Sequence, residues 1–179
     1  EIGTRDLTGA LHLGEGFFRK GGFSKYTLSA NGARSNATPP AGQFESYIPA
    51  ITIGEGTTIR PVADSLIAEE TESGGEIVLN QVRNQEGLRS PVSLSFNATG
   101  MDDPFTVDSL EVRADIVMAA GSSIVTDAGG SVSFKGDTVT LLGSVTTPGG
   151  RITVSGASSF PLRGTQRNLV TQALPTVHI

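Results

Sequence analysis

One passage of this 179-residue chain is followed closely by a second passage similar to it. The stretch GSSIVTDAGGSVSFKG begins at Gly121, and GSVTTPGGRITVSG begins at Gly143. At an offset of 20 residues the aligned identities are Val125 with Val145, Thr126 with Thr146, Gly129–Gly130 with Gly149–Gly150, and Gly136 with Gly156. Such repetition constrains the architecture more than any single residue, because a short repeat buries its apolar face only against its neighbours.

Apolar and polar residues alternate throughout the repeated region. Val132 and Phe134 share one side of their segment, and Ile152 and Val154 take the same places in the second copy. A period of two in short β-branched runs, bounded by Gly, Pro and Asp, predicts strands. We expect them near residues 123–126, 131–134 and 138–141, and no helix in this half of the chain.

Three strands within about twenty residues favour a coil that returns above its own start. Each strand then pairs in parallel with its equivalent one turn later, and inward side chains stack into ladders. Gly129–Gly130 and Gly149–Gly150 would stack at one corner, where glycine adopts positive φ at little cost. The sequence therefore predicts an all-β protein, a parallel β-helix (solenoid) of roughly 20-residue coils with loop insertions at corners.

Two further echoes extend this pattern upstream. ITIGEGTTI (51–59) matches IVMAAGSSI (116–124) at an offset of 65, which we interpret as near three coils. LHLGEGFF is a weaker copy, with Leu11, Leu13 and Gly16 in the corresponding places. Ile116–Met118 also matches Val139–Leu141 at an offset of 23, so a corner would absorb three extra residues.

Residues 1–179 are expected to form a single β-helix segment of a larger surface protein. Less regular stretches interrupt it at 30–46, 68–76 and 97–108. Insertions in a β-helix grow from corners, because wall ladders cannot absorb them. Loops on a rigid scaffold commonly carry function, so we expect binding in these three excursions.

Composition narrows the function classes. The net charge is -5, the sequence pI is about 5.0, and the basic residues are scattered singly apart from Arg19–Lys20. This argues against nucleic-acid binding, which needs a basic patch. There is no cysteine, hence no disulfide or thiolate metal site, and no apolar run long enough for a membrane helix. The chain starts at Glu1 without a signal segment and is expected to be a mature internal fragment.

No residue is predicted to be catalytic, cofactor-binding or metal-ligating, and ligand-binding residues are not assigned. His12 is expected to be exposed, and His178 lies far from it in sequence, so no zinc site is recognisable. The acids Glu69, Glu70, Glu72 and Glu76 lack a calcium-loop motif and are interpreted as a solvated loop. Asp102 and Asp103 precede a proline and are expected to cap a turn.

An enzymatic site on an outer wall would need a carboxylate pair projecting from adjacent coils. In the repeat, Asp127 aligns with Thr147 and Lys135 with Ser155, so no acids stack. The sequence therefore does not predict a catalytic site on this wall.

The run from Arg113 to Gly156 resembles the passenger region of bacterial filamentous haemagglutinin-like exoproteins, as do FFRKGGFSKYTLSANG and GLRSPVSLSFNATG. The resemblance implies a right-handed parallel β-helix, two-partner (type V) secretion and a cell-surface role in adhesion. The secretion-domain tetrapeptides NPNL and NPNG of that family are missing, which implies a passenger segment. The family supplies no catalytic residue to carry over.

We therefore expect a structural and adhesive segment of a secreted protein on the bacterial cell surface. Its partners would be a host or neighbouring-cell surface, whether protein or glycan, and the outer-membrane transporter that acts on the parent protein. Two alternatives stay open: a carbohydrate-active β-helix enzyme (lyase or hydrolase), and a self-associating matrix or filament segment. Because LVTQALPTVHI (169–179) again alternates, we also expect end-to-end self-association through an uncapped last coil.

Overall fold

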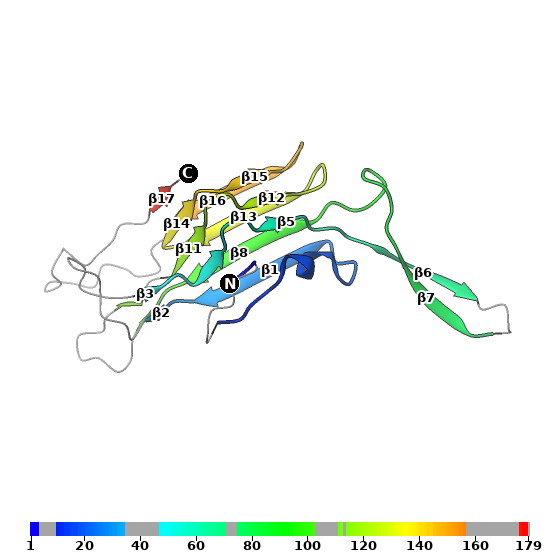
Figure 1. Cartoon of the computed structure of the whole chain (residues 1–179), viewed down its shortest axis with the longest axis horizontal. Coiled ribbons are helices and arrows are strands. Elements are labelled where there is room, and N and C mark those ends of the chain that lie inside the picture. The colour runs from blue at the N-terminus through cyan, green and yellow to red at the C-terminus, as the bar shows by residue number, and fades with distance from the viewer. Residues whose placement is uncertain are drawn as a thin grey trace, which may run out of the picture.

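The computed structural model describes residues 1–3, 10–34, 47–70, 75–102, 111–112, 114–156 and 176–178 (Figure 1). This part of the chain is mostly strands, and its one helical element is the 3-10 turn η1 (Glu15–Arg19). The class is therefore all-β with parallel sheets, as the alternation predicted. Within the described residues no helix is both long enough and apolar enough to span a membrane.

Three sheets are built entirely from parallel strands. Sheet A contains β1 (Lys25–Asn31), β8 (Ser93–Thr99), β13 (Ser131–Gly136) and β16 (Arg151–Gly156), in that order. Sheet B contains β4 (Ile51–Ile53), β11 (Asp115–Met118), β14 (Thr138–Leu141) and β17 (Thr176–His178). Sheet C contains β5 (Thr58–Ile59), β12 (Ser123–Val125) and β15 (Ser144–Thr146).

The chain visits the three sheets in a constant order. One pass runs through β1, β4 and β5, the next through β8, β11 and β12, and the third through β13, β14 and β15. Each strand pairs in parallel with its equivalent on the next pass, so equivalent residues form ladders.

The core is the set of inward ladders. In sheet A, Leu28, Phe96, Phe134 and Val154 occupy one ladder, and the rings of Phe96 and Phe134 stack with centroids 5.1 Å apart. The corresponding buried side chains in sheets B and C are Ile51, Ile53, Ile116, Met118, Val139, Leu141, Ile59 and Ile124.

The repeat offset of 20 is confirmed in sheet A but wrong in sheet C. β13 pairs with β16 at that offset, whereas β12 pairs with β15 at 21, so Ile124 rather than Val125 lies beside Val145. The second copy has four residues (147–150) between paired strands where the first has five (126–130). An offset of 20 would have placed buried Ile124 beside exposed Ser144, since a one-residue slip exchanges the faces of a strand.

The offset of 65 predicted the correct strand partners but the wrong number of coils between them. Ile116 pairs with Ile51 and Ile124 with Ile59, as expected. These strands are direct neighbours, however, so the offset spans one pass and not three. Its length comes from the segments inserted between β5 and β8 and between β8 and β11.

The paired glycines stack at one corner. Gly129 and Gly149 have φ of +82° and +59°, and the amide of Gly129 donates to the carbonyl of Pro148 at 2.8 Å. A Cβ on Gly150 would overlap the carbonyl oxygen of Gly130. Close approach of two backbones thus requires glycine here.

At the N-terminal end, LHLGEGFF follows the predicted repeat pattern only in part. Leu13 and Ile53 both pair with Ile2, which lies between them and extends sheet B. Leu11, expected in the same apolar row, is exposed. The segment after Leu13 forms η1 instead of a strand, and the Thr58 amide donates to Glu15 Oε1 at 2.8 Å, which caps sheet C.

The starts predicted for the excursions at 30 and 97 are too early, because β1 extends to Asn31 and β8 to Thr99. An antiparallel pair of strands lies in or beside each excursion. β2 (Ala33–Arg34) pairs with β3 (Tyr47–Ile48), and β9 (Met101–Asp102) pairs with β10 (Glu111–Val112). β6 (Ser65–Glu70) and β7 (Ile77–Val82) form a hairpin arm that projects from the body (Figure 1). The stretch interpreted as a loop at 68–76 is thus partly strand, since Ala68–Glu70 belong to β6.

Among the described strands of sheet A, β16 is the outermost. Ile152, which continues the buried ladder of Leu94 and Val132, is 47% exposed because no described strand pairs with the other side of β16. β17 pairs with β14, and residues 169–173 lie outside the described part.

Candidate functional site

The outward residues of sheet A form a continuous polar face, which we call the outer face. Alternation along each strand sends every second side chain outward, and the parallel register aligns these side chains across strands. Its three ladders are Lys25–Ser93–Ser131–Arg151, Thr27–Ser95–Ser133–Thr153 and Ser29–Asn97–Lys135–Ser155.

Hydroxyl groups within the outer face hydrogen-bond to one another. Ser131 donates to Ser93 and Ser133 to Ser95, each at 3.0 Å between oxygens. Ser95 lies 3.4 Å from Asn97 Oδ1. The serine–serine bonds join neighbouring strands, and the remaining lone pairs and protons of these groups could bind a ligand.

The charge of the outer face is positive although the chain carries -5. Lys25, Lys135 and Arg151 are exposed there, and the three ladders contain no carboxylate. Lys25 and Arg151 are three strand spacings apart, or about 14 Å. The predicted alignment of Lys135 with Ser155 is confirmed. Asp127 lies at a corner, where it pairs with Arg89.

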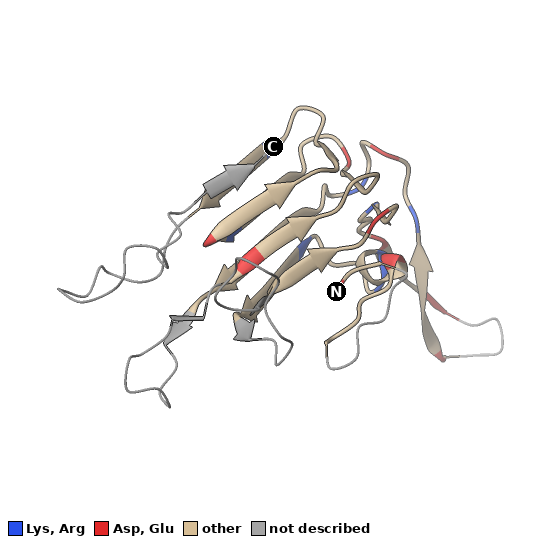
Figure 2. Ribbon diagram, turned by 60° about the vertical axis from the view of Figure 1, so that its left-hand side comes forward, with Lys and Arg blue, Asp and Glu red and all other residues tan. Residues whose placement is uncertain are grey.

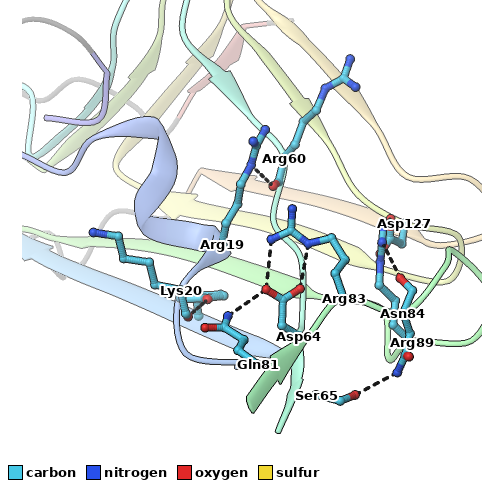
Figure 3. Close-up of polar contacts among 11 residues, drawn as sticks. Arg19, Lys20, Arg60, Asp64, Ser65, Gln81, Arg83, Asn84, Arg89 and Asp127 are labelled. Carbon is cyan, nitrogen blue, oxygen red and sulfur yellow. Dashed lines mark hydrogen bonds and ion pairs between the residues drawn. The ribbon is translucent and has the colours of Figure 1, made fainter. Parts of the chain in front are cut away.

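A second polar cluster holds the root of the arm (Figure 3). Arg83 donates to both carboxylate oxygens of Asp64 at 2.9 and 3.0 Å, and Gln81 donates to the same carboxylate at 2.8 Å. The hydrogen bonds from Arg83 lower the pKa of the Asp64 carboxyl against the opposing effect of burial. Asn84 donates to Ser65 at 3.0 Å, so β6 and β7 are tied together where they leave the body.

The pKa values of Tyr26 and Arg89 are also shifted by their surroundings. Burial raises the pKa of Tyr26, and the Asp64 charge adds to that effect. Arg89 donates to both oxygens of Asp127, at 2.5 and 2.6 Å, and to the carbonyl of Asn84. The hydrogen bonds that Arg89 donates to Asp127 raise the pKa of Arg89, which keeps its guanidinium charged.

Basic residues that look scattered in the sequence gather around η1. Arg19 donates to the carbonyl of Arg60 at 3.1 Å, and Lys20 accepts a hydrogen bond from the Tyr26 hydroxyl through its carbonyl (Figure 3). All three basic side chains are exposed. In the sequence only the Arg19–Lys20 doublet indicates this patch, because Arg60 is distant from both residues along the chain.

The structure keeps the residues weighed for metal binding apart. His12 is half-buried, not exposed, and its Nδ1 is buried without a partner. His178 lies in β17, in another part of sheet B. Among the described residues, no cluster of three His, Cys, Asp or Glu side chains could hold a metal ion.

The acidic residues also differ from their sequence interpretation. Glu69 and Glu70 lie in β6, with Glu69 Oε2 accepting from Asn80 at 2.6 Å, and Glu76 directly precedes β7. Glu72 and Asp103 lie outside the described residues. Asp102 belongs to β9 and pairs with Glu111, so it is not a turn residue.

No protein-family model, curated protein or solved structure matches this chain. The site is therefore interpreted from its own chemistry.

Proposed function

We propose that this chain is a structural and adhesive segment of a secreted bacterial surface protein, similar to the filamentous haemagglutinin-like exoproteins. Its three parallel sheets, visited in constant order, support a solenoid of the parallel β-helix type. A right-handed path is the general rule for parallel crossovers. The parent protein would reach the surface through its outer-membrane transporter.

The outer face of sheet A is the observation that carries the adhesive role. It offers hydroxyl and amide groups in three straight rows, with three cations and no carboxylate among them. Such a face provides many weak polar contacts to a protein or glycan on a host or neighbouring cell. A glycosidase or lyase would instead need a carboxylate pair, or a base with acidic metal ligands, on its binding wall.

The test measures binding and catalysis together. The purified chain is applied to glycan arrays and to cultured cells, and the supernatant is assayed for released saccharide. We expect binding without release, and binding at least fivefold weaker for Lys135→Ala/Arg151→Ala. The matched control, Lys135→Arg/Arg151→Lys, keeps both charges and should keep most of the binding. Release of saccharide would favour the carbohydrate-active alternative, and equal binding by both double variants would remove the outer face from the proposal.

A further inference from the structure

The β6–β7 arm exposes an unusual amount of apolar surface. Every residue of both strands is exposed apart from Ser65 and Val82 at the root, which are half-buried. The large apolar side chains that face solvent are Leu66, Ile67, Ile77, Val78 and Leu79. An exposed apolar surface rimmed by polar residues marks an interaction site.

The antiparallel register gathers the most exposed of these side chains on one side of the arm. Leu66 lies opposite Gln81, Ala68 opposite Leu79, and Glu70 opposite Ile77. Leu66, Leu79 and Ile77 on this side are 60%, 63% and 70% exposed. A two-stranded ribbon is only marginally stable by itself, so a partner that covers this side would stabilise it.

The arm leaves the body in a defined direction. The bidentate contact of Arg83 with Asp64, together with the Gln81 and Asn84 hydrogen bonds, locks its root. Six residues per strand at about 3.3 Å each give the arm a reach of about 20 Å. An arm that is long, fixed at its root and paired with no described strand other than its own two is pre-organised for docking.

The arm is also acidic. Glu69, Glu70 and Glu76 are exposed, and neither β6 nor β7 contains a lysine or arginine. Its partner should therefore combine apolar side chains with basic ones.

The chain itself carries such a surface beside η1, and we call it the cap surface. Phe17 and Phe23 are exposed and border Tyr26, with ring centroids 6.0 and 6.1 Å from it. The exposed cations Arg19 and Lys20 follow Phe17 closely in the chain, and Arg19 Nε donates to the carbonyl of Arg60, which brings Arg60 close to Arg19. No ion pair within the described residues engages these three. By alternation, Glu70 shares the side of the arm that carries Leu66, Leu79 and Ile77, whereas Glu69 and Glu76 face the other side and border it. The cap surface thus offers aromatic rings for the apolar side chains and cations for the carboxylates. Figure 2 shows acidic segments along the arm, and both basic and acidic segments near η1.

We propose that the arm of one chain docks on the cap surface of a second copy, and that the second arm returns the contact. A two-fold axis makes both contacts equivalent, which closes the assembly as a dimer. This contact differs from end-to-end stacking, which would use the open edge of β16 and its exposed Ile152. It requires neither the adhesive role nor a β-helix classification.

A charge exchange tests the pairing. Sedimentation equilibrium measures the dimer dissociation constant of the wild type, of Glu70→Lys/Glu76→Lys on the arm, and of Arg19→Glu/Lys20→Glu on the cap surface. Each double variant should dimerise at least tenfold more weakly, and the quadruple variant should recover most of the affinity because the charges are exchanged. Glu69 is left intact because it accepts the Asn80 hydrogen bond.

Two controls separate this contact from others. Glu86→Lys changes an exposed acid outside the arm and should leave dimerisation unchanged. Ile152→Lys charges the open edge of sheet A and should also leave it unchanged. Thermal melts of every variant check that the body is folded.

Three results would overturn the proposal. The wild type could stay a monomer up to millimolar concentration, the quadruple variant could fail to recover affinity, or Ile152→Lys could abolish association while the arm variants retain it. The last result would favour end-to-end stacking.

Discussion

At the scale of single residues, Phe134 shows what the ladder arrangement demands. Its ring is fully buried and stacks on Phe96, with Val154 on the other side. Phe134→Ala should lower the free energy of unfolding by about 3–5 kcal/mol, as other large core truncations do. Ser133→Ala, its outward neighbour, loses only the hydroxyl bond to Ser95 and should cost less than about 1 kcal/mol. Urea melts compare the two, and equal losses would contradict the assignment of inner and outer faces.

Asp64 should make stability depend on pH. Its pKa in the folded chain is lowered, chiefly by the hydrogen bonds from Arg83, below the value of about 3.9 for a free aspartate. The unfolded chain therefore binds more protons in acid, so this contribution is complete above about pH 5 and is lost as the pH falls toward and through the folded pKa. The difference in unfolding free energy between wild type and Asp64→Asn should shrink between pH 5 and pH 3. In an Arg83→Gln background the shrinkage should be smaller; a difference that stays constant with pH would count against the ion pair.

At the scale of elements, the stacked glycine corner decides whether adjacent passes can pair closely. Gly150→Ala forces the new methyl group into the backbone of Gly130 and should cost about 1–3 kcal/mol, as overpacked sites do. Gly16→Ala is a matched control in η1, where a Cβ meets nothing within 4 Å, and it should change stability by less than about 0.5 kcal/mol. Thermal melts measure both, and similar effects would argue against close stacking at this corner.

The tip of the arm is a segment that the body should tolerate losing. Deleting Glu69 to Gly75 removes residues that are exposed wherever the structure describes them. Because closure entropy changes slowly with loop length, the far-UV β signal and the melting of the body should persist. Collapse of that signal would show that the sheets depend on the arm.

At the scale of the whole molecule, the stack should be unevenly protected. β13 has neighbours on both sides in sheet A, whereas β16 has a described neighbour on one side. Amide hydrogen exchange should be at least about tenfold slower for β13 than for the outward-bonding amides of β16, because open edges exchange through smaller fluctuations. Equal protection of these two copies of the repeat would mean that β16 is covered in solution.

The local pattern of the sequence determined the strands and much of the pairing. Alternation identified the inward residues Val132, Phe134, Val139 and Leu141, all of which are buried. The offsets of 20, 23 and 65 identified the partners of β16, β14 and β4, since stacked passes repeat the same side-chain demands. The inward residues and the strand partners could be predicted because alternation and repetition of apolar residues are local properties of the sequence.

Only the tertiary structure decided what distant segments do together. The sheet C register depends on one corner residue, and Ile152 is exposed because burial depends on a neighbouring strand, not on its own apolarity. No periodicity predicts that Arg83 binds Asp64, or that Arg60 joins Arg19 and Lys20, because long-range contacts depend on how insertions fold back. In the sequence, the residues of the candidate surfaces appear only as alternating serines and scattered charges. Stacking of the passes brings these residues together into continuous surfaces.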